Sequence, residues 1–89
     1  MTMQEISKEL DIPIGILEKE SVKAFLDNKI RLIETEMFTI AKKYGIKDTK
    51  DFDKAVQEGK FHEDASEDYM KFDYLEAEFN RFSSLLDQI

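Results

Sequence analysis

The side chains best suited to chemistry are crowded in one acidic segment. In chain order they are His62, Glu63, Asp64, Glu67 and Asp68. Imidazole and carboxylate groups of this kind bind metal ions or transfer protons. However, His62 and Glu63 lack the second histidine of an HExxH motif, and Asp64 followed by Glu67 resembles a capping box at the start of a helix. We therefore expect no metal ligand and no catalytic residue in this segment.

The remaining sequence also lacks the spacing of a catalytic or cofactor motif. Within residues 48–53, Lys50 and Phe52 stand beside positions where a calcium loop needs oxygen ligands. The chain has no cysteine and its three glycines are isolated, so it has neither a thiolate site nor a phosphate-binding loop. Arg31 and Arg81 are its only arginines, too few for the several cations that a dicarboxylate substrate requires. We expect no cofactor and no enzymatic activity.

The net charge of −7 comes entirely from the C-terminal half. Residues 1–47 carry eight acidic and eight basic side chains, whereas residues 48–89 carry twelve and five. Because phosphate affinity comes from Lys and Arg, this distribution argues against a nucleic acid partner. It suits a basic protein partner, or it is simply a solvated face. The absence of cysteine, of a long apolar run and of a signal-peptide pattern predicts a cytoplasmic protein without a membrane partner.

Two long amphipathic helices would position any functional group. One is carried by residues 21–44 and the other begins at about Ala65. Their apolar seams are Leu26, Ile30, Ile33, Met37, Ile40 and Tyr44, and Phe72, Leu75, Phe79, Phe82, Leu86 and Ile89. Spacings of three and four residues keep each seam on one helix face. Two complementary seams predict an all-α fold, an antiparallel long-helix hairpin of coiled-coil type. The facing pairs would be Tyr44 with Phe72, Ile33 with Phe82, and Leu26 with Ile89.

Capping residues set the expected ends of the helices. The first long helix starts within 14–18 and stops at Gly45, which suits a left-handed C-cap. Asp48 caps a short connecting helix that runs to about Glu58. The apolar face of that short helix consists of Phe52, Ala55 and Val56.

Some apolar residues lie off the two seams. They are Val22, Phe25, Leu32, Tyr74 and Leu85. One partner helix covers a single stripe, so this set needs further cover. We predict that the set forms a partner interface, covered by a second copy that completes a helical bundle or by another protein.

The N-terminal segment allows two interpretations. We expect residues 1–17 to form an arm and residues 18–89 to form the hairpin domain. Residues 6–16 resemble a helix–turn–helix phrase with Asp11 at the turn, although the second helix offers no Arg, Lys, Asn or Gln at its start to read bases. The alternation along residues 6–12, followed by Pro13, instead fits an extended arm. Either would serve a small DNA-binding regulator that uses residues 5–18.

Three segments carry a resemblance to a known group of proteins. Residues 18–26 (EKESVKAFL), 43–47 (KYGIK) and 72–76 (FDYLE) resemble small archaeal helical proteins of unassigned role, some of them antitoxin-like. This resemblance implies a helical protein that wraps a basic toxin and blocks its active surface. We therefore expect a non-catalytic protein–protein interaction module that neutralises a basic partner, with the DNA-binding regulator as the alternative.

Overall fold

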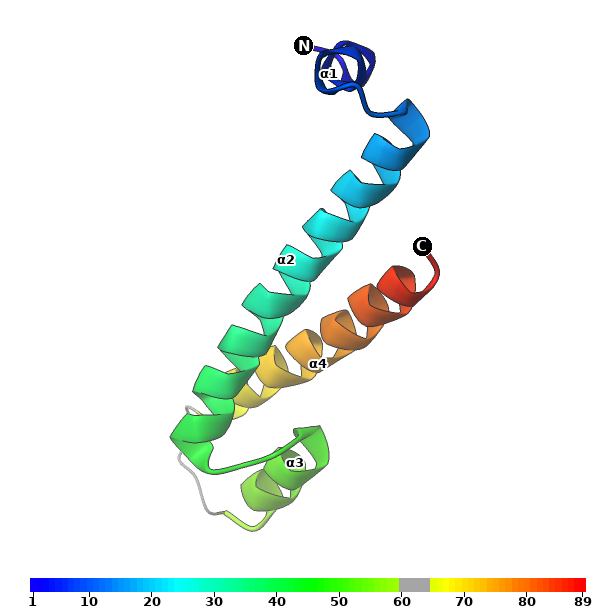
Figure 1. Ribbon diagram of the computed structural model, residues 1–89. Coiled ribbons are helices and arrows are strands. Elements are labelled where there is room, and N and C mark those ends of the chain that lie inside the picture. The colour runs from blue at the N-terminus through cyan, green and yellow to red at the C-terminus, as the bar shows by residue number, and fades with distance from the viewer. Residues whose placement is uncertain (60–64) are drawn as a thin grey trace.

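Two long antiparallel helices dominate the fold (Figure 1). The structure is a computed structural model that describes residues 1–59 and 65–89. Within those residues all regular secondary structure is helical, as α1 (Met3–Leu10), α2 (Ile14–Tyr44), α3 (Thr49–Gln57) and α4 (Ala65–Asp87). Helices α2 and α4 lie side by side, α3 packs at their closed end, and α1 lies at the far tip of α2. The predicted all-α antiparallel hairpin with a short connecting helix is confirmed.

The predicted ends of α2 and α3 are confirmed by their caps. Gly45 ends α2 in the left-handed conformation (φ 65°), and its N–H donates to the carbonyl oxygen of Ala41. A residue with a side chain is strained there, because its Cβ would crowd the backbone. Asp48 begins α3, where its carboxylate accepts a 2.8 Å hydrogen bond from the N–H of Asp51. Of the predicted capping box of α4, Asp64 lies outside the described residues.

The extended interpretation of the N-terminal arm is wrong, because residues 3–10 form α1. The hydroxyl of Thr2 accepts from the N–H of Glu5 at 3.1 Å, and the Glu5 carboxylate accepts from the N–H of Thr2 at 3.4 Å. This capping box satisfies two of the N–H groups that a helix start leaves unpaired. The chain then turns at Asp11, which has a positive φ of 56°, and α1 is seen nearly end-on in Figure 1 while α2 runs across the view.

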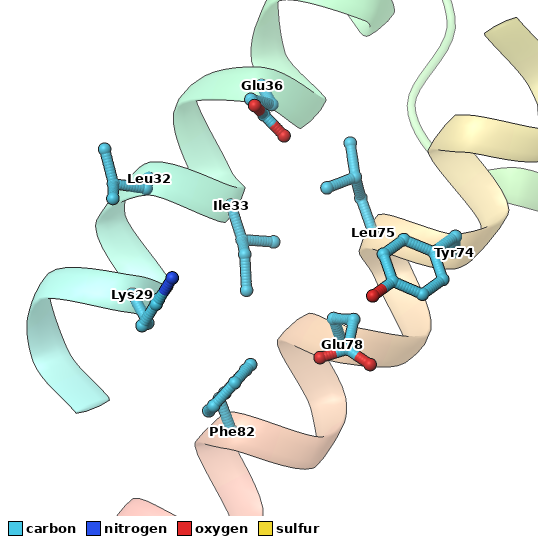
Figure 2. A pocket seen from close by; sticks show the side chains of 8 residues that line it. All are labelled: Lys29, Leu32, Ile33, Glu36, Tyr74, Leu75, Glu78 and Phe82. Carbon is cyan, nitrogen blue, oxygen red and sulfur yellow. The ribbon is translucent and has the colours of Figure 1, made fainter. Parts of the chain in front are cut away.

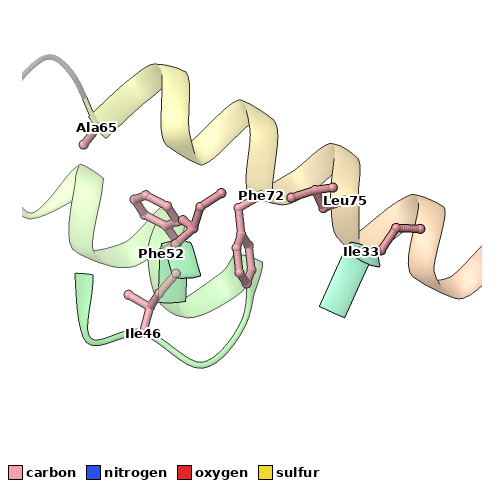
Figure 3. Packing of buried hydrophobic residues seen from close by; sticks show 7 residues of the cluster. Ile33, Ile46, Phe52, Ala65, Phe72 and Leu75 are labelled. Carbon is pink, nitrogen blue, oxygen red and sulfur yellow. The ribbon is translucent and has the colours of Figure 1, made fainter. Parts of the chain in front are cut away.

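The core lies where α3 meets the closed end of the hairpin (Figure 3). Phe52 and Phe72 are at most 1% exposed. The ring centroid of Phe52 lies 4.8 Å from that of Tyr44, 5.5 Å from that of Tyr69 and 6.1 Å from that of Phe72. The buried members of the cluster are Ile33, Ile40, Ile46, Phe52, Ala65, Phe72 and Leu75. Both predicted seams therefore contribute to the core, and Phe52 joins them to α3.

The molecule is long for its size. It measures 59 × 23 × 16 Å and has a radius of gyration of 18.7 Å, against about 12 Å for a compact domain of this length. The reason is visible in Figure 1, where α2 continues well past the end of α4. Apolar burial is therefore concentrated at the closed end of the hairpin.

We predict that Phe52→Ala lowers the free energy of unfolding by about 3–5 kcal/mol, because it opens a cavity between three helices. Phe38→Ala is the matched control, since Phe38 is 68% exposed, and should change that free energy by less than about 0.5 kcal/mol. Urea unfolding followed by circular dichroism measures both. Similar losses for the two variants would contradict the placement of the core.

Two glycine variants should change stability in opposite directions. Gly45→Ala should cost about 1–2 kcal/mol, because alanine is strained at positive φ. Gly15→Ala should stabilise by up to about 1 kcal/mol, because Gly15 lies inside α2 with open space around its missing Cβ. Thermal unfolding measures the difference, and equal shifts of the same sign would contradict the cap assignment.

Candidate protein-binding groove

A groove of about 410 Å³ lies between α2 and α4 (Figure 2). Helix α2 contributes Lys29, Leu32, Ile33 and Glu36, and α4 contributes Tyr74, Leu75, Glu78 and Phe82. Ile33 and Leu75 are buried, whereas Leu32 and Tyr74 are exposed. The groove thus combines an apolar base with a charged rim. Ile33 and Phe82, which the sequence pairs across the seams, both line it from opposite helices.

The helical repeat explains why these side chains meet. Ile33 lies on the seam of α2, and positions 29, 32 and 36 follow one stripe next to it, since residues three, four and seven apart share a helix face. Tyr74 and Glu78 form the corresponding stripe on α4, four residues apart. Each helix therefore contributes one seam and one flanking stripe to the groove.

The structure separates the five predicted interface residues into two groups. All five are between 44% and 62% exposed. Leu32 and Tyr74 line the groove from opposite helices. Phe25 lies seven residues before Leu32, and Leu85 lies eleven residues after Tyr74, so both continue the flanking stripes. We call these four side chains the apolar surface.

Val22 lies apart from the apolar surface. Helix α4 ends at Asp87, and the α2–α4 alignment places Phe25 at that level, so Val22 lies on the part of α2 beyond the end of α4. It is exposed because no residue of α4 reaches it. The prediction that the set binds a partner remains a prediction.

Sequence reasoning missed the charged rim of the groove. Lys29 and Glu36 lie three residues before and four residues after Leu32, on its own stripe, and that spacing was available in the sequence. Lys29 also lies over the ring of Phe25, with its Nζ 5.9 Å from the ring centroid. On α4, Glu78 forms a 2.7 Å ion pair with Arg81.

The sequence predicts no metal ligand and no catalytic residue in the acidic segment, which runs from His62 to Asp68. His62, Glu63 and Asp64 lie outside the described residues. Within the described ranges, no three metal-binding side chains gather into a site. Asp68 instead accepts hydrogen bonds from the hydroxyl of Tyr44 and, at 2.9 Å, from Nζ of Lys43. Its position is explained by these partners.

The Asp68 contact shifts three pKa values. Hydrogen bonds from Tyr44 and then Lys43 lower the pKa of Asp68 below its ordinary value of 3.8. The bond to Asp68 raises the pKa of Tyr44 above 10.0, and burial adds to that increase. The same carboxylate raises the pKa of Lys43. A charged acid therefore joins the end of α2 to the start of α4 and fixes their alignment below the groove.

A second polar contact ties α3 to α4. The N–H and the hydroxyl of Thr49 both donate to Oε2 of Glu76, at 3.1 and 2.5 Å. Because Thr49 is the first residue of α3, this carboxylate satisfies one of the N–H groups left free at a helix start. The closed end is thus held by apolar packing and by two carboxylates of α4.

The fold and the groove define a small all-α hairpin protein. A family model described as the Uncharacterized protein MJ0235 family matches residues 1–89, and the chain belongs to that family. Searches of curated proteins and of solved structures gave no match. None of the helices in the described ranges is both long enough and apolar enough to cross a bilayer.

We predict that Asp68→Asn lowers the free energy of unfolding by about 1 kcal/mol at neutral pH, because the amide loses the charged hydrogen bonds. The pKa of Asp68 is lower in the folded state, so its stabilisation is present above pH 3.8 and is lost as the pH falls through the folded value. The difference between wild type and variant should therefore shrink below about pH 4. Urea unfolding across pH measures it.

Asp87→Asn is the control, since Asp87 is an exposed acid at the end of α4. A difference for Asp68→Asn that stayed constant at low pH would contradict the assigned role. At high pH the stability should fall rather than rise with increasing pH, because the pKa of Tyr44 is raised in the folded state. Its contribution is present below pH 10.0 and should be lost as the pH rises through the folded value.

Proposed function

We propose that the protein is a non-catalytic protein–protein interaction module that binds through the apolar surface around the α2–α4 groove. The observation that carries this proposal is the exposure of Phe25, Leu32, Tyr74 and Leu85 beside a groove with an apolar base. Each of these four side chains is between 44% and 62% exposed. Large apolar side chains exposed on both sides of a groove are typical of a surface that another protein covers.

The charge of the chain supports a basic partner. The excess of acidic residues falls within 48–89, which includes α3 and α4. Two of these acids, Asp53 and Asp73, act together on Tyr69, whose pKa is raised by desolvation and then by their charges. A negative field of this kind speeds encounter with a basic protein and favours it over an acidic one. The resemblance to antitoxin-like proteins supports the same partner class, a small basic toxin whose active surface the module covers.

The alternative is a small DNA-binding regulator that uses residues 5–18. One observation favours it, since α1 and the start of α2 form two helices joined at Asp11, as in a helix–turn–helix unit. The charge of this segment opposes it. Residues 5–18 contain four acidic side chains and Lys8 as their one base, whereas binding to phosphates depends on cations. The interaction module is therefore the function that we propose.

To test the proposal, tagged protein would capture partners from cells that encode it, and the captured protein would be identified and purified separately. We expect a small basic protein whose affinity, measured by calorimetry, falls as salt rises. Leu32→Glu should weaken that binding at least about tenfold, because it puts a charge on the apolar surface. Phe38→Glu should leave it within about twofold, since Phe38 lies about 120° around α2 from Leu32.

A second pair of variants tests the charge. Asp53→Asn with Asp73→Asn should weaken binding of the basic protein and reduce its salt dependence. The matched control, Glu20→Gln with Glu34→Gln, removes the same charge from the balanced half of the chain and should have a smaller effect. Recovery of no basic partner, or binding indifferent to both pairs, would contradict the proposal. Retardation of duplex DNA at low salt by the purified protein would favour the regulator instead.

A further inference from the structure

We propose that a second copy of this chain occupies the groove, in a two-fold pairing that stacks α2 antiparallel on α2 and α4 antiparallel on α4. This inference rests on the proposed function, because it names the protein that covers the apolar surface. It is carried by the order of charges along the two stripes that flank the groove.

The stripe on α2 is complementary to itself when reversed. Lys29 and Glu36 lie equally far from the midpoint between Leu32 and Ile33, and both line the groove. A two-fold axis through that midpoint brings Lys29 of each copy opposite Glu36 of the other. A parallel pairing would instead place like charges together, at a cost in affinity. The charges on α2 therefore select the antiparallel arrangement.

The stripe on α4 has the same property. Glu78 and Arg81 lie equally far from the midpoint between Phe79 and Asn80, and so do Tyr74 and Leu85. Reversal about that midpoint sets Glu78 opposite Arg81 of the second copy and Tyr74 opposite Leu85. Arg81 is bonded to Glu78 within the chain but stays 64% exposed, and a guanidinium has donors for a second carboxylate.

One axis satisfies both stripes. The bond between Tyr44 and Asp68 aligns the helices, and counting twelve residues back from Tyr44 and twelve forward from Asp68 reaches Leu32 and Asn80. The midpoints of the two stripes are therefore the same number of residues away from this bond. A single two-fold axis running across the hairpin passes both, as a closed dimer requires.

The size of the surface fits a modest dimer. A standard interface buries roughly 800 Å² per partner, and the four exposed apolar side chains with the charged residues between them would supply part of that area. Covering it would also stack two elongated hairpins into a four-helix arrangement. The dimer would carry twice the net charge of −7, which strengthens its field toward a basic partner.

Charge reversals in the full chain test the pairing. Sedimentation velocity from about 1 to about 200 μM should show wild type approaching twice its mass of 10.5 kDa. Lys29→Glu alone and Glu36→Lys alone should each raise the dissociation constant roughly tenfold or more, because two attractive contacts become repulsive. Mixing the two single variants should restore the dimer, since positions 29 and 36 of one variant then face side chains of opposite charge in the other.

The controls make the same charge changes away from the groove. Lys23→Glu and Glu34→Lys are exposed on other faces of α2 and should leave the dissociation constant within about twofold. Circular dichroism would check that every variant keeps its helix content. A monomeric wild type, single variants that behave like the controls, or a mixture that stays monomeric would each overturn the pairing.

The results also separate this inference from the proposed function. A monomer that still binds an identified basic protein would overturn the pairing and leave the interaction module in place. A dimer that responds to the charge reversals and binds no basic protein would support the pairing and remove the proposed partner class.

Discussion

The hydrogen bond between Tyr44 and Asp68, with Lys43 on the same carboxylate, determines how α2 and α4 are aligned. The two apolar seams repeat every three or four residues, so a shift of one heptad would still bring seam against seam. Such a shift would separate Asp68, at the start of α4, from its two donors at the end of α2. The polar contact therefore selects one register from several that apolar packing alone would allow.

Packing around Phe52 makes that register possible. Helix α3 brings a buried aromatic side chain against Tyr44, Tyr69 and Phe72 at one end of the hairpin. Among the described residues, no comparable aromatic cluster packs at the other end, where α2 continues beyond α4. The apolar surface lies on the stripes that flank the two seams, where it stays exposed beside the packed residues.

The sequence predicted the helices well and the contacts between them less well. The seams, the Gly45 cap and the Asp48 cap follow from local rules. The structure confirms both caps and buries residues of both seams, but Ile89, the predicted last seam residue, lies past the end of α4 and is 42% exposed. The N-terminal arm was left open between a helix–turn–helix phrase and an extended arm, and the capping box of Thr2 and Glu5, a local signal for a helix, was not considered. The spacing of Lys29, Leu32 and Glu36 was present in the sequence, but their place beside the groove and the role of Asp68 depend on which residue of α2 faces which residue of α4. Only the folded register supplies that information.

The proposed pairing and the proposed basic partner make different demands on the charges of the chain. The apolar surface and its alternating rim charges lie along α2 and α4 around the groove, where each copy presents both signs. Asp53 and Asp73 both act on Tyr69, which packs against Phe52 near the closed end. A balanced set of charges suits a surface that meets its own copy, because like charges must not face each other across a two-fold axis. An unbalanced set suits a surface that meets a different protein of opposite sign. The basic partner is also proposed for the apolar surface, so it would compete there with the second copy, and the excess of acidic residues would favour the basic partner.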